Sequence, residues 1–264
     1  MDASLPPEAT SEAVIQRLEA DPGKPDRIFV TVGPPDGDPT AASTFGLHIA
    51  VVAHEALYVG MACPPAVVER LQASDVFQQH YDRALNFLAV RPRSVAEVRL
   101  RLRRKATPPE ILDAIVERLL RVGYLDDAAF ARYWIGERAR SRPRGARLLR
   151  QELRQKGVAA PVVEAALSEH AAEAEDQPVP GAVGAAVREL GATDEPRAVR
   201  EALGLAQRRA RTYAGLDAQT YRRRLGGFLL RRGYDYEVVA RVFKLLAAVA
   251  EGAETLENLD EGAP

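Results

Sequence analysis

The chain has 264 residues, of which 47% are hydrophobic and 28% charged, and its formal net charge is −1. This composition is typical of a folded globular protein of one or two domains. Its apolar runs are too short for a membrane-spanning helix, which needs roughly 18 residues. The single cysteine, Cys63, excludes an internal disulfide and disfavours a cysteine metal site. Because residues 1–11 lack a basic, apolar leader, we expect a cytoplasmic protein.

The net charge changes sign along the chain. Residues 1–82 carry 4 Lys and Arg against 12 Asp and Glu, residues 83–156 carry 19 against 8, and residues 157–264 carry 13 against 17. Clustered positive charge suggests an acidic or polyanionic partner. Arginine-rich helices that are simply solvated would give the same composition, so the alternative stays open.

The first quarter of the chain is predicted to be a small β/α cap. Residues 1–25, rich in Pro, Glu, Asp and Ala, are expected to form a mobile extension with a short helix-compatible patch at Val14 to Leu18. Residues 26–76 are expected to form the cap. A strand at Ile28 to Val32 alternates apolar residues, a second strand follows at 44–47, and helices are expected at 49–57 and from Pro64 to about Ser74.

From residue 77 onward the sequence reads as short helices punctuated by capping signals. Ser94 to Glu97 and Thr107 to Glu110 fit the capping-box pattern. Asp126 and Asp127 are expected to cap a helix beginning at Ala128. Three glycines follow helices that end in basic residues, at the position where a left-handed cap is needed: Gly123, Gly157 and Gly233.

An internal repeat organises this helical part. Arg91-Pro92-Arg93 recurs as Arg142-Pro143-Arg144, an offset of 51 residues that also carries Leu102 onto Leu153 and Lys105 onto Lys156. A further offset of 76 carries Leu153 onto Leu229, Lys156 onto Arg232 and Gly157 onto Gly233. We therefore predict repeat 1 (77–122), repeat 2 (123–169), a linker (170–197), repeat 3 (198–250) and an acidic tail (251–264). The expected fold class is mainly α: tandem three-helix repeats in an elongated curved array behind the N-terminal cap.

Signatures of catalysis are missing from the sequence. The four histidines have no metal-binding spacing, and neither a phosphate-binding glycine loop nor a nucleophile elbow occurs. Cys63 has no basic neighbour and is expected to be an inert, packed residue. The aromatic residues Phe130, Tyr133 and Trp134 are expected in the core, and Tyr124 and Tyr234 should cover helix ends. We therefore expect neither an enzyme nor a cofactor, a metal site or a catalytic residue.

Basic residues at recurring positions are the candidate functional site. They avoid the apolar stripes of their helices and could contact phosphates or carboxylates on an extended partner. For any single arginine, a solvated surface position is an equally good interpretation. The set comprises Arg93, Arg99, Arg103, Lys105, Arg144, Arg147, Arg150, Arg154, Lys156, Arg223 and Arg232.

Two motifs of the first two repeats are specific: Gly123-Tyr124-Leu125-Asp126-Asp127 and the run from Gln151 to Gly157. Weaker motifs are Ala84-Leu85-Asn86-Phe87-Leu88, Arg91-Pro92-Arg93-Ser94 and Leu102-Arg103-Arg104-Lys105. Through these motifs, residues 81–167 resemble the RecX family of RecA regulators. Two features depart from the regular repeat: the insertion at 170–197, and Gly226-Gly227 inside a helix of repeat 3, which are expected to make that repeat dock differently or move more.

The resemblance implies a function. It implies three-helix repeats in a crescent that lies in the groove of the RecA filament on single-stranded DNA and spans neighbouring protomers. Such a protein inhibits ATP hydrolysis and strand exchange in DNA repair, recombination and the SOS response. We expect a monomer whose partner is the RecA filament, with single-stranded DNA contacted weakly or indirectly and no membrane contact. The alternative is a direct DNA-binding protein of helix-turn-helix type.

Overall fold

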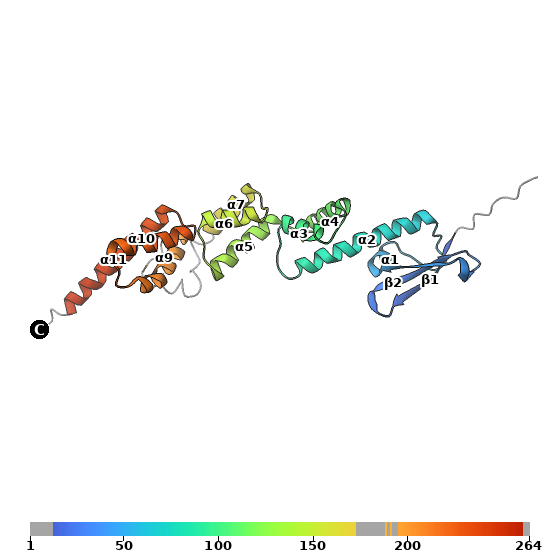
Figure 1. The fold of residues 1–264 in the computed structure, drawn as a ribbon, viewed down its shortest axis with the longest axis horizontal. Helices are drawn as coiled ribbons and strands as arrows, with labels where there is room; N and C mark the ends of the chain where they lie inside the picture. The colour runs from blue at the N-terminus through green and yellow to red at the C-terminus, as the bar shows by residue number, and fades with distance from the viewer. Residues whose placement is uncertain (1–12, 173–187, 189–190, 192–194, 261–264) are drawn as a thin grey trace, which may run out of the picture. The chain divides into compact units, whose positions relative to one another are not determined.

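The N-terminal part is a three-stranded antiparallel sheet covered by helices, and the other elements among the described residues are helical (Figure 1). The structure, a computed structural model, describes residues 13–172, 188, 191 and 195–260; the side chains of Pro39 and residues 249–260 are outside this description. Two compact units are present, one made of residues 1–91 with 99–121 and the other of residues 92–98 with 122–264.

The sheet has the order β1-β2-β3, formed by β1 (Val14–Asp21), β2 (Lys24–Gly33) and β3 (Ser43–His48). The prediction of a mobile extension with a helical patch is wrong for β1, which pairs with β2 along its length. A register shift between Ile15 and Arg17 interrupts the apolar alternation, so the sequence hides this strand. Residues 1–12 of the predicted extension lie outside the described residues.

The sheet packs on α1 (Ile49–His54) and on α2 (Pro65–Leu88) around a core that includes Ile15, Val30 and Leu47. The buried Asp75 of α2 binds the sheet: its carboxylate accepts from Arg27 Nη1 at 2.8 Å and from the His48 backbone N–H at 2.6 Å. The predicted boundary near residue 76 is wrong, because α2 runs unbroken from the cap into repeat 1. α1 also ends earlier than expected, at His54.

Repeat 1 consists of the second half of α2, α3 (Val95–Arg103) and α4 (Pro109–Arg121). Leu112, Ile115 and Leu119 bury one face of α4, and the Arg118 guanidinium lies 4.7 Å from the Tyr81 ring centroid of α2. The Thr107 hydroxyl lies 2.8 Å from His80 Nδ1 of α2. Thr107 therefore connects the start of α4 to α2 through its side chain.

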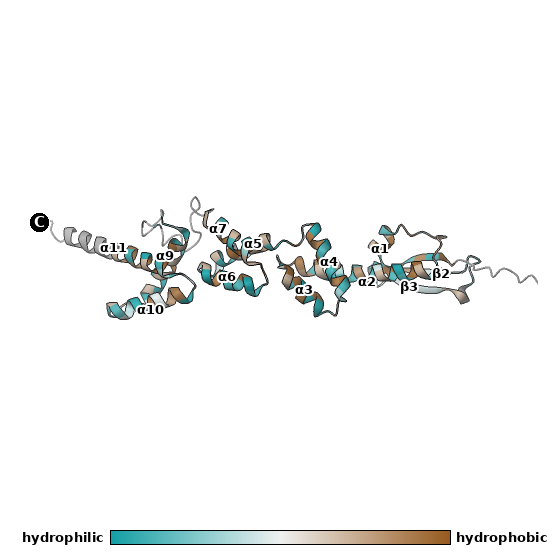
Figure 2. Cartoon of the chain, turned by 90° about the horizontal axis from the view of Figure 1, so that it is seen from above, coloured by the Kyte–Doolittle hydropathy of each residue, from teal (hydrophilic) through white to brown (hydrophobic). Residues whose placement is uncertain are grey.

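Repeats 2 and 3 each have their own core, and Figures 1 and 2 show the three helices of each repeat. Repeat 2 contains α5 (Asp127–Ser141), α6 (Ala146–Gln155) and α7 (Ala160–Ala172), packed around Phe130, Leu149 and Leu153. Repeat 3 contains α9 (Arg197–Ala210), α10 (Ala218–Arg231) and α11 (Tyr236–Asp260), and the short 3-10 turn η2 (Arg211–Tyr213) lies between α9 and α10. A second 3-10 turn, η1 (Pro39–Ala41), lies between β2 and β3 of the sheet. Because α11 continues through Asp260, residues 251–260 are helical rather than a separate tail.

The predicted caps are largely confirmed. Gly123, Gly157 and Gly233 have φ angles of 77°, 77° and 91°, where a side chain would be strained. Ser94 Oγ accepts from the Glu97 N–H at 3.1 Å, and Asp126 accepts from the Ala128 N–H at 2.7 Å. These bonds satisfy backbone donors at the starts of α3 and α5.

The aromatic residues divide into confirmed and wrong predictions. Phe130 is buried, Trp134 packs against the repeat 2 core and Tyr133 is half-buried. Tyr234, 2% exposed, covers the end of α10 as expected. Tyr124 does not cover α4, because it is 62% exposed. Cys63 is buried and free, and burial raises the pKa of its thiol, which agrees with an inert packed residue.

Candidate functional site

The outer face of α6 brings three of the predicted arginines together. Leu149 and Leu153, four residues apart, bury the inner face of this helix in the repeat 2 core. The opposite face carries Arg147, Arg150 and Arg154. These residues line a shallow depression of about 490 Å³, whose lining is completed by Gln151 and Gln155. We call this set the α6 basic face.

Arg150 of this face forms an ion pair that recurs in repeat 1. Arg150 Nε donates to both carboxylate oxygens of Glu164 on α7, at 2.9 and 3.0 Å. Arg99 of α3 pairs with Asp113 of α4, and both partners lie 51 residues before those of repeat 2. The equivalent positions in repeat 3, 76 residues later, are Gly226 and Ala240. The pair therefore links the second helix to the third in two repeats only.

Arg150 and Glu164 each favour the charged form of the other. Hydrogen bonding to Glu164 raises the pKa of Arg150, and hydrogen bonding from Arg150 lowers the pKa of Glu164. Arg150 is half-buried, while Arg154, one turn further along α6, is exposed. Arg154 is consequently the more available cation of the two for an external acidic group.

Arg144 and Lys156 belong to a different environment, around Trp134. Arg144 forms an ion pair with Glu152, which also accepts from Trp134 Nε1 at 2.8 Å. Lys156 Nζ donates to Glu97 at 2.7 Å and lies 4.2 Å from the Trp134 ring centroid. Both side chains are half-buried and engaged inside the protein. Their role here is structural packing rather than free surface charge.

Consecutive repeats meet through equivalent residues. Ser94 Oγ, at the start of α3, donates to the Lys156 carbonyl at 2.6 Å. Gly145 is the equivalent residue at the start of α6, and its backbone N–H donates to the Arg232 carbonyl at 3.0 Å. In each junction the N-terminal end of an earlier helix therefore satisfies a carbonyl at the C-terminal end of the next repeat's helix.

Arg147 strengthens the second of these junctions. Its Nη2 donates to the Leu230 carbonyl of α10 at 2.9 Å. At both junctions the capping glycine allows the close approach: a Cβ on Gly157 would lie 2.4 Å from Ala96 Cβ, and one on Gly233 would lie 2.5 Å from Leu148 Cβ. The sequence pattern predicts these glycines as caps, but it does not indicate their second role in packing between repeats.

The remaining predicted residues divide by exposure. Arg232 is half-buried over the Phe228 ring, at 5.3 Å from its centroid, and Arg93 is half-buried and engaged. Four predicted cations are exposed, and none has an ion-pair partner within 4 Å among the described residues: Arg103, Lys105, Arg154 and Arg223. Further exposed arginines were missed because they do not recur at the repeat offsets: Arg101, Arg104, Arg222 and Arg224. The available signal was the density of basic residues at 101–105, interrupted only by Leu102, and at 222–224.

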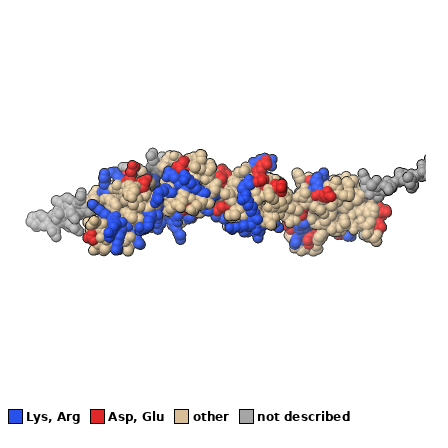
Figure 3. All heavy atoms as spheres, turned by 45° about the horizontal axis from the view of Figure 1, so that its top comes forward, with Lys and Arg blue, Asp and Glu red and all other residues tan. Residues whose placement is uncertain are grey.

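Basic side chains gather over the helical repeats and are sparse over the N-terminal sheet, as Figure 3 shows. No cluster of three or more His, Cys, Asp or Glu residues that could hold a metal ion occurs within the described ranges. No helix in those ranges is both long enough and apolar enough to cross a membrane. The surface chemistry that stands out is therefore positive charge on short amphipathic helices.

Comparison with known proteins accounts for this architecture. Three RecX family models match the chain: the first three-helix domain at residues 81–119, the second at 126–167 and the third at 199–243. The chain is 31% identical to the regulatory protein RecX of Streptomyces coelicolor over 189 residues, which cover 71% of this chain and 87% of that protein. It is 33% identical to the RecX of Amycolatopsis mediterranei over 181 residues, covering 69% and 89% of the two chains.

Solved structures share the fold. A crystal structure of a regulatory protein RecX superposes with a TM-score of 0.65 at 19% identity, covering 88% of this chain and 99% of the other. The RecX of Lactobacillus salivarius superposes with a TM-score of 0.54 at 18% identity, covering 66% and 99%. Three RecX domains match the chain, and two RecX proteins are more than 30% identical to it over most of their own length. The chain therefore belongs to the RecX family of regulatory proteins.

Proposed function

We propose that this protein binds the RecA filament on single-stranded DNA and lowers its recombinase and ATPase activity during DNA repair. Membership of a family of regulatory proteins supports this proposal, since the family name itself points to RecA. The proposal includes a cytoplasmic, monomeric and non-enzymatic regulator acting in recombination and the SOS response. The observation that carries it is the set of three matching RecX domains, joined by two equivalent junctions.

The α6 basic face is the surface that we propose for the filament. Guanidinium groups bind carboxylates and phosphates with two parallel hydrogen bonds, and a filament presents both groups at regular intervals. Arg154 is free of ion pairs with described residues, and Arg147 and Arg150 each keep part of their donor capacity after their internal bonds. The face therefore suits an extended acidic partner.

The decisive experiment measures RecA ATPase activity on single-stranded DNA with increasing amounts of this protein. We expect activity to fall with the ratio of regulator to RecA, because binding along the filament opposes the cycle of nucleotide hydrolysis. Circular dichroism of the same preparation checks that the regulator is folded. Unchanged ATPase activity at every ratio, with folded protein, would contradict the proposal.

Direct DNA binding is the second candidate, favoured by the exposed run of Arg222, Arg223 and Arg224 at α10. A salt titration of binding to single-stranded and duplex DNA, without RecA, separates the two. Contacts with phosphates alone give an affinity that falls steeply with salt and depends little on sequence. Tight, sequence-selective binding to duplex DNA would favour the second candidate over the first.

A further inference from the structure

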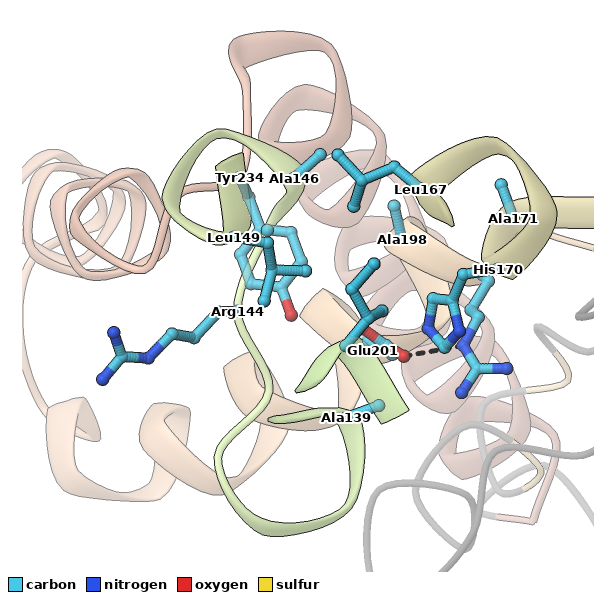
Figure 4. A pocket seen from close by; sticks show the side chains of 13 residues that line it. Ala139, Arg144, Ala146, Leu149, Leu167, His170, Ala171, Ala198, Glu201 and Tyr234 are labelled. Carbon is cyan, nitrogen blue, oxygen red and sulfur yellow. Dashed lines mark hydrogen bonds and ion pairs between the residues drawn. The ribbon is translucent and has the colours of Figure 1, made fainter. Parts of the chain in front are cut away.

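A small cavity lies between repeats 2 and 3 (Figure 4). Its volume is about 100 Å³, and its walls come from α5, α6, α7 and α9, with Tyr234 closing one side. Four wall residues are alanines, whose short side chains leave the space open: Ala139, Ala146, Ala171 and Ala198. The cavity is too small for a typical cofactor, which needs roughly 300 Å³ or more, so it suits a compact molecule.

The Tyr234 hydroxyl is a buried polar group that lacks a partner in the part of the chain that the structure describes. Tyr234 is 2% exposed, and its hydroxyl has no hydrogen-bond partner among the described residues. In Figure 4 the hydroxyl oxygen points to the side of the cavity on which Glu201 lies. Buried hydroxyls are normally hydrogen-bonded, because leaving one without a partner is unfavourable. An occupant that supplies an acceptor is therefore favoured here.

The charges around the cavity are already balanced. Glu201, 6% exposed, accepts from Arg197 Nε at 2.8 Å. Burial and the nearby Arg197 lower the pKa of His170 to about 4, so the imidazole is neutral at pH 7. Burial and the charge of Glu201 raise the pKa of Tyr234, which keeps its hydroxyl protonated and able to donate. Arg144 is engaged by Glu152, so a charged occupant would find no unpaired counter-charge.

We propose that this cavity binds a small neutral carboxamide, with its carbonyl oxygen accepting from the Tyr234 hydroxyl and its amino group donating to the Glu201 carboxylate. A primary amide places an acceptor and two donors on one carbon, which matches a hydroxyl donor beside a carboxylate acceptor. Its aliphatic part occupies the space between the alanines. The same group ends a glutamine side chain, so the carboxamide comes from a free small molecule or from a peptide.

The test is an NMR titration of the full-length protein with methyl-labelled alanine. The probes are butyramide, a short peptide containing glutamine, and the charged analogues butyrate and butylammonium. We expect butyramide or the peptide to shift the Ala146 and Ala198 methyl signals with saturation, and the charged analogues to bind at least about tenfold more weakly. The arm that saturates identifies the source of the amide. Equal binding of the charged analogues, or no saturation by about 100 mM of either amide, would overturn the proposal.

Variants locate the interaction. Tyr234→Phe keeps the ring but removes the donor, so the dissociation constant of the amide should rise about tenfold. Tyr124→Phe is the matched control, because Tyr124 also follows a capping glycine but is exposed, and it should change nothing. Ala198→Leu and Ala171→Val each fill the cavity and should abolish binding, and at least one must remain folded by circular dichroism. Unchanged affinity in Tyr234→Phe, or in a folded cavity-filling variant, would remove the site.

Amide binding at this cavity requires no RecA. Amide binding is measured on the isolated protein, so its failure leaves the proposed regulation of the filament untouched. Conversely, a regulator without effect on RecA could still bind the amide, and the two failures are distinguishable.

Discussion

At the scale of single residues, Gly157 and Gly233 combine two requirements at one position. Each ends a helix with a positive φ, and each leaves room for the preceding repeat to approach. The position 51 residues before Gly157 is Ala106, which adopts a φ of 53° despite its side chain. In repeat 1 the backbone conformation is thus kept without glycine, which indicates that close packing is the stronger reason for glycine in repeats 2 and 3.

Substitution separates these two requirements. Gly123 and Gly157 share a φ of 77°, but a Cβ on Gly123 meets no atom within 4 Å. We expect Gly123→Ala to lower the free energy of unfolding by about 1 kcal/mol, the cost of the left-handed conformation. Gly157→Ala should cost about 2–4 kcal/mol, because the clash with Ala96 adds to the same strain. Urea denaturation of both variants measures the difference, and equal losses would show that the junction does not constrain this residue.

His170 makes the stability of the second unit depend on pH. Its pKa is lowered from 6.5 to about 4 by burial and by Arg197, so the folded protein binds this proton less readily than the unfolded chain does. The contribution of the neutral imidazole is fully present above pH 6.5 and is lost as the pH falls towards 4, by about 3 kcal/mol at most. Burial raises the pKa of the neighbouring Glu201, which acts in the opposite direction as the pH falls.

The contribution of His170 is isolated by comparison with a variant. Urea denaturation of the wild-type protein and of His170→Asn between pH 7 and pH 5 gives the two pH profiles. The wild-type protein should lose more stability than the variant over this range, because only the wild-type protein carries an imidazole at position 170. Parallel profiles would contradict the assignment.

At the scale of helices and strands, periodic and capping signals were the reliable guides. The stripe of Leu149 and Leu153 and the cap at Asp126 correctly predicted α6 and α5. β1 could not be predicted, because its register shift breaks the alternation on which strand recognition depends. The continuity of α2 was equally hidden, since no residue pattern marks where a helix passes from one core to the next.

The function proposed for the α6 basic face is tested by charge reversal. The double variant Arg150→Glu with Arg154→Glu should weaken RecA inhibition by about tenfold or more, because it replaces attraction by repulsion towards acidic groups. Arg150→Glu also replaces the ion pair with Glu164 by repulsion between two carboxylates. The control variant must therefore lose an ion pair between the same two kinds of residue in the same way. Arg132→Glu provides it, since Arg132 of α5 pairs with Glu169 of α7 in an exposed ion pair.

Both variants are compared in the RecA ATPase assay after their folding is checked by circular dichroism. We expect the control to inhibit as the wild-type protein does. If the folded double variant inhibits equally well, the α6 basic face is not the surface that contacts the filament.

At the scale of the whole molecule, the residues of the candidate site were only partly predictable. The repeat offsets identified which arginines are equivalent, but they carried no information on which residues each side chain contacts. Arg144 and Lys156 satisfy the same pattern as Arg154, yet only Arg154 lacks an ion pair with described residues. The partners Glu152 and Glu97 come from other turns and other repeats, and only the folded chain brings them close.

The predicted elongated, curved array stays a prediction and is measurable in solution. A compact chain of this length would have a radius of gyration of about 18 Å. We expect small-angle X-ray scattering to give a clearly larger value, with light scattering confirming a monomer. A monomer with a radius of gyration near 18 Å would contradict the stacking of repeats that the sequence pattern predicts.

The two junctions between repeats determine which repeat can follow another. A second copy of repeat 2, inserted directly after the first, would place its own equivalent of Gly157 at the junction with the preceding copy. A gene duplication at this point should therefore yield a longer protein that folds. A copy of repeat 1 in the same place would bring the Ala106 methyl group against its neighbour, where the native glycines leave no space for a Cβ. Repeat 1 is thus restricted to the beginning of the series, and lengthening by duplication is open only to the repeats that follow it.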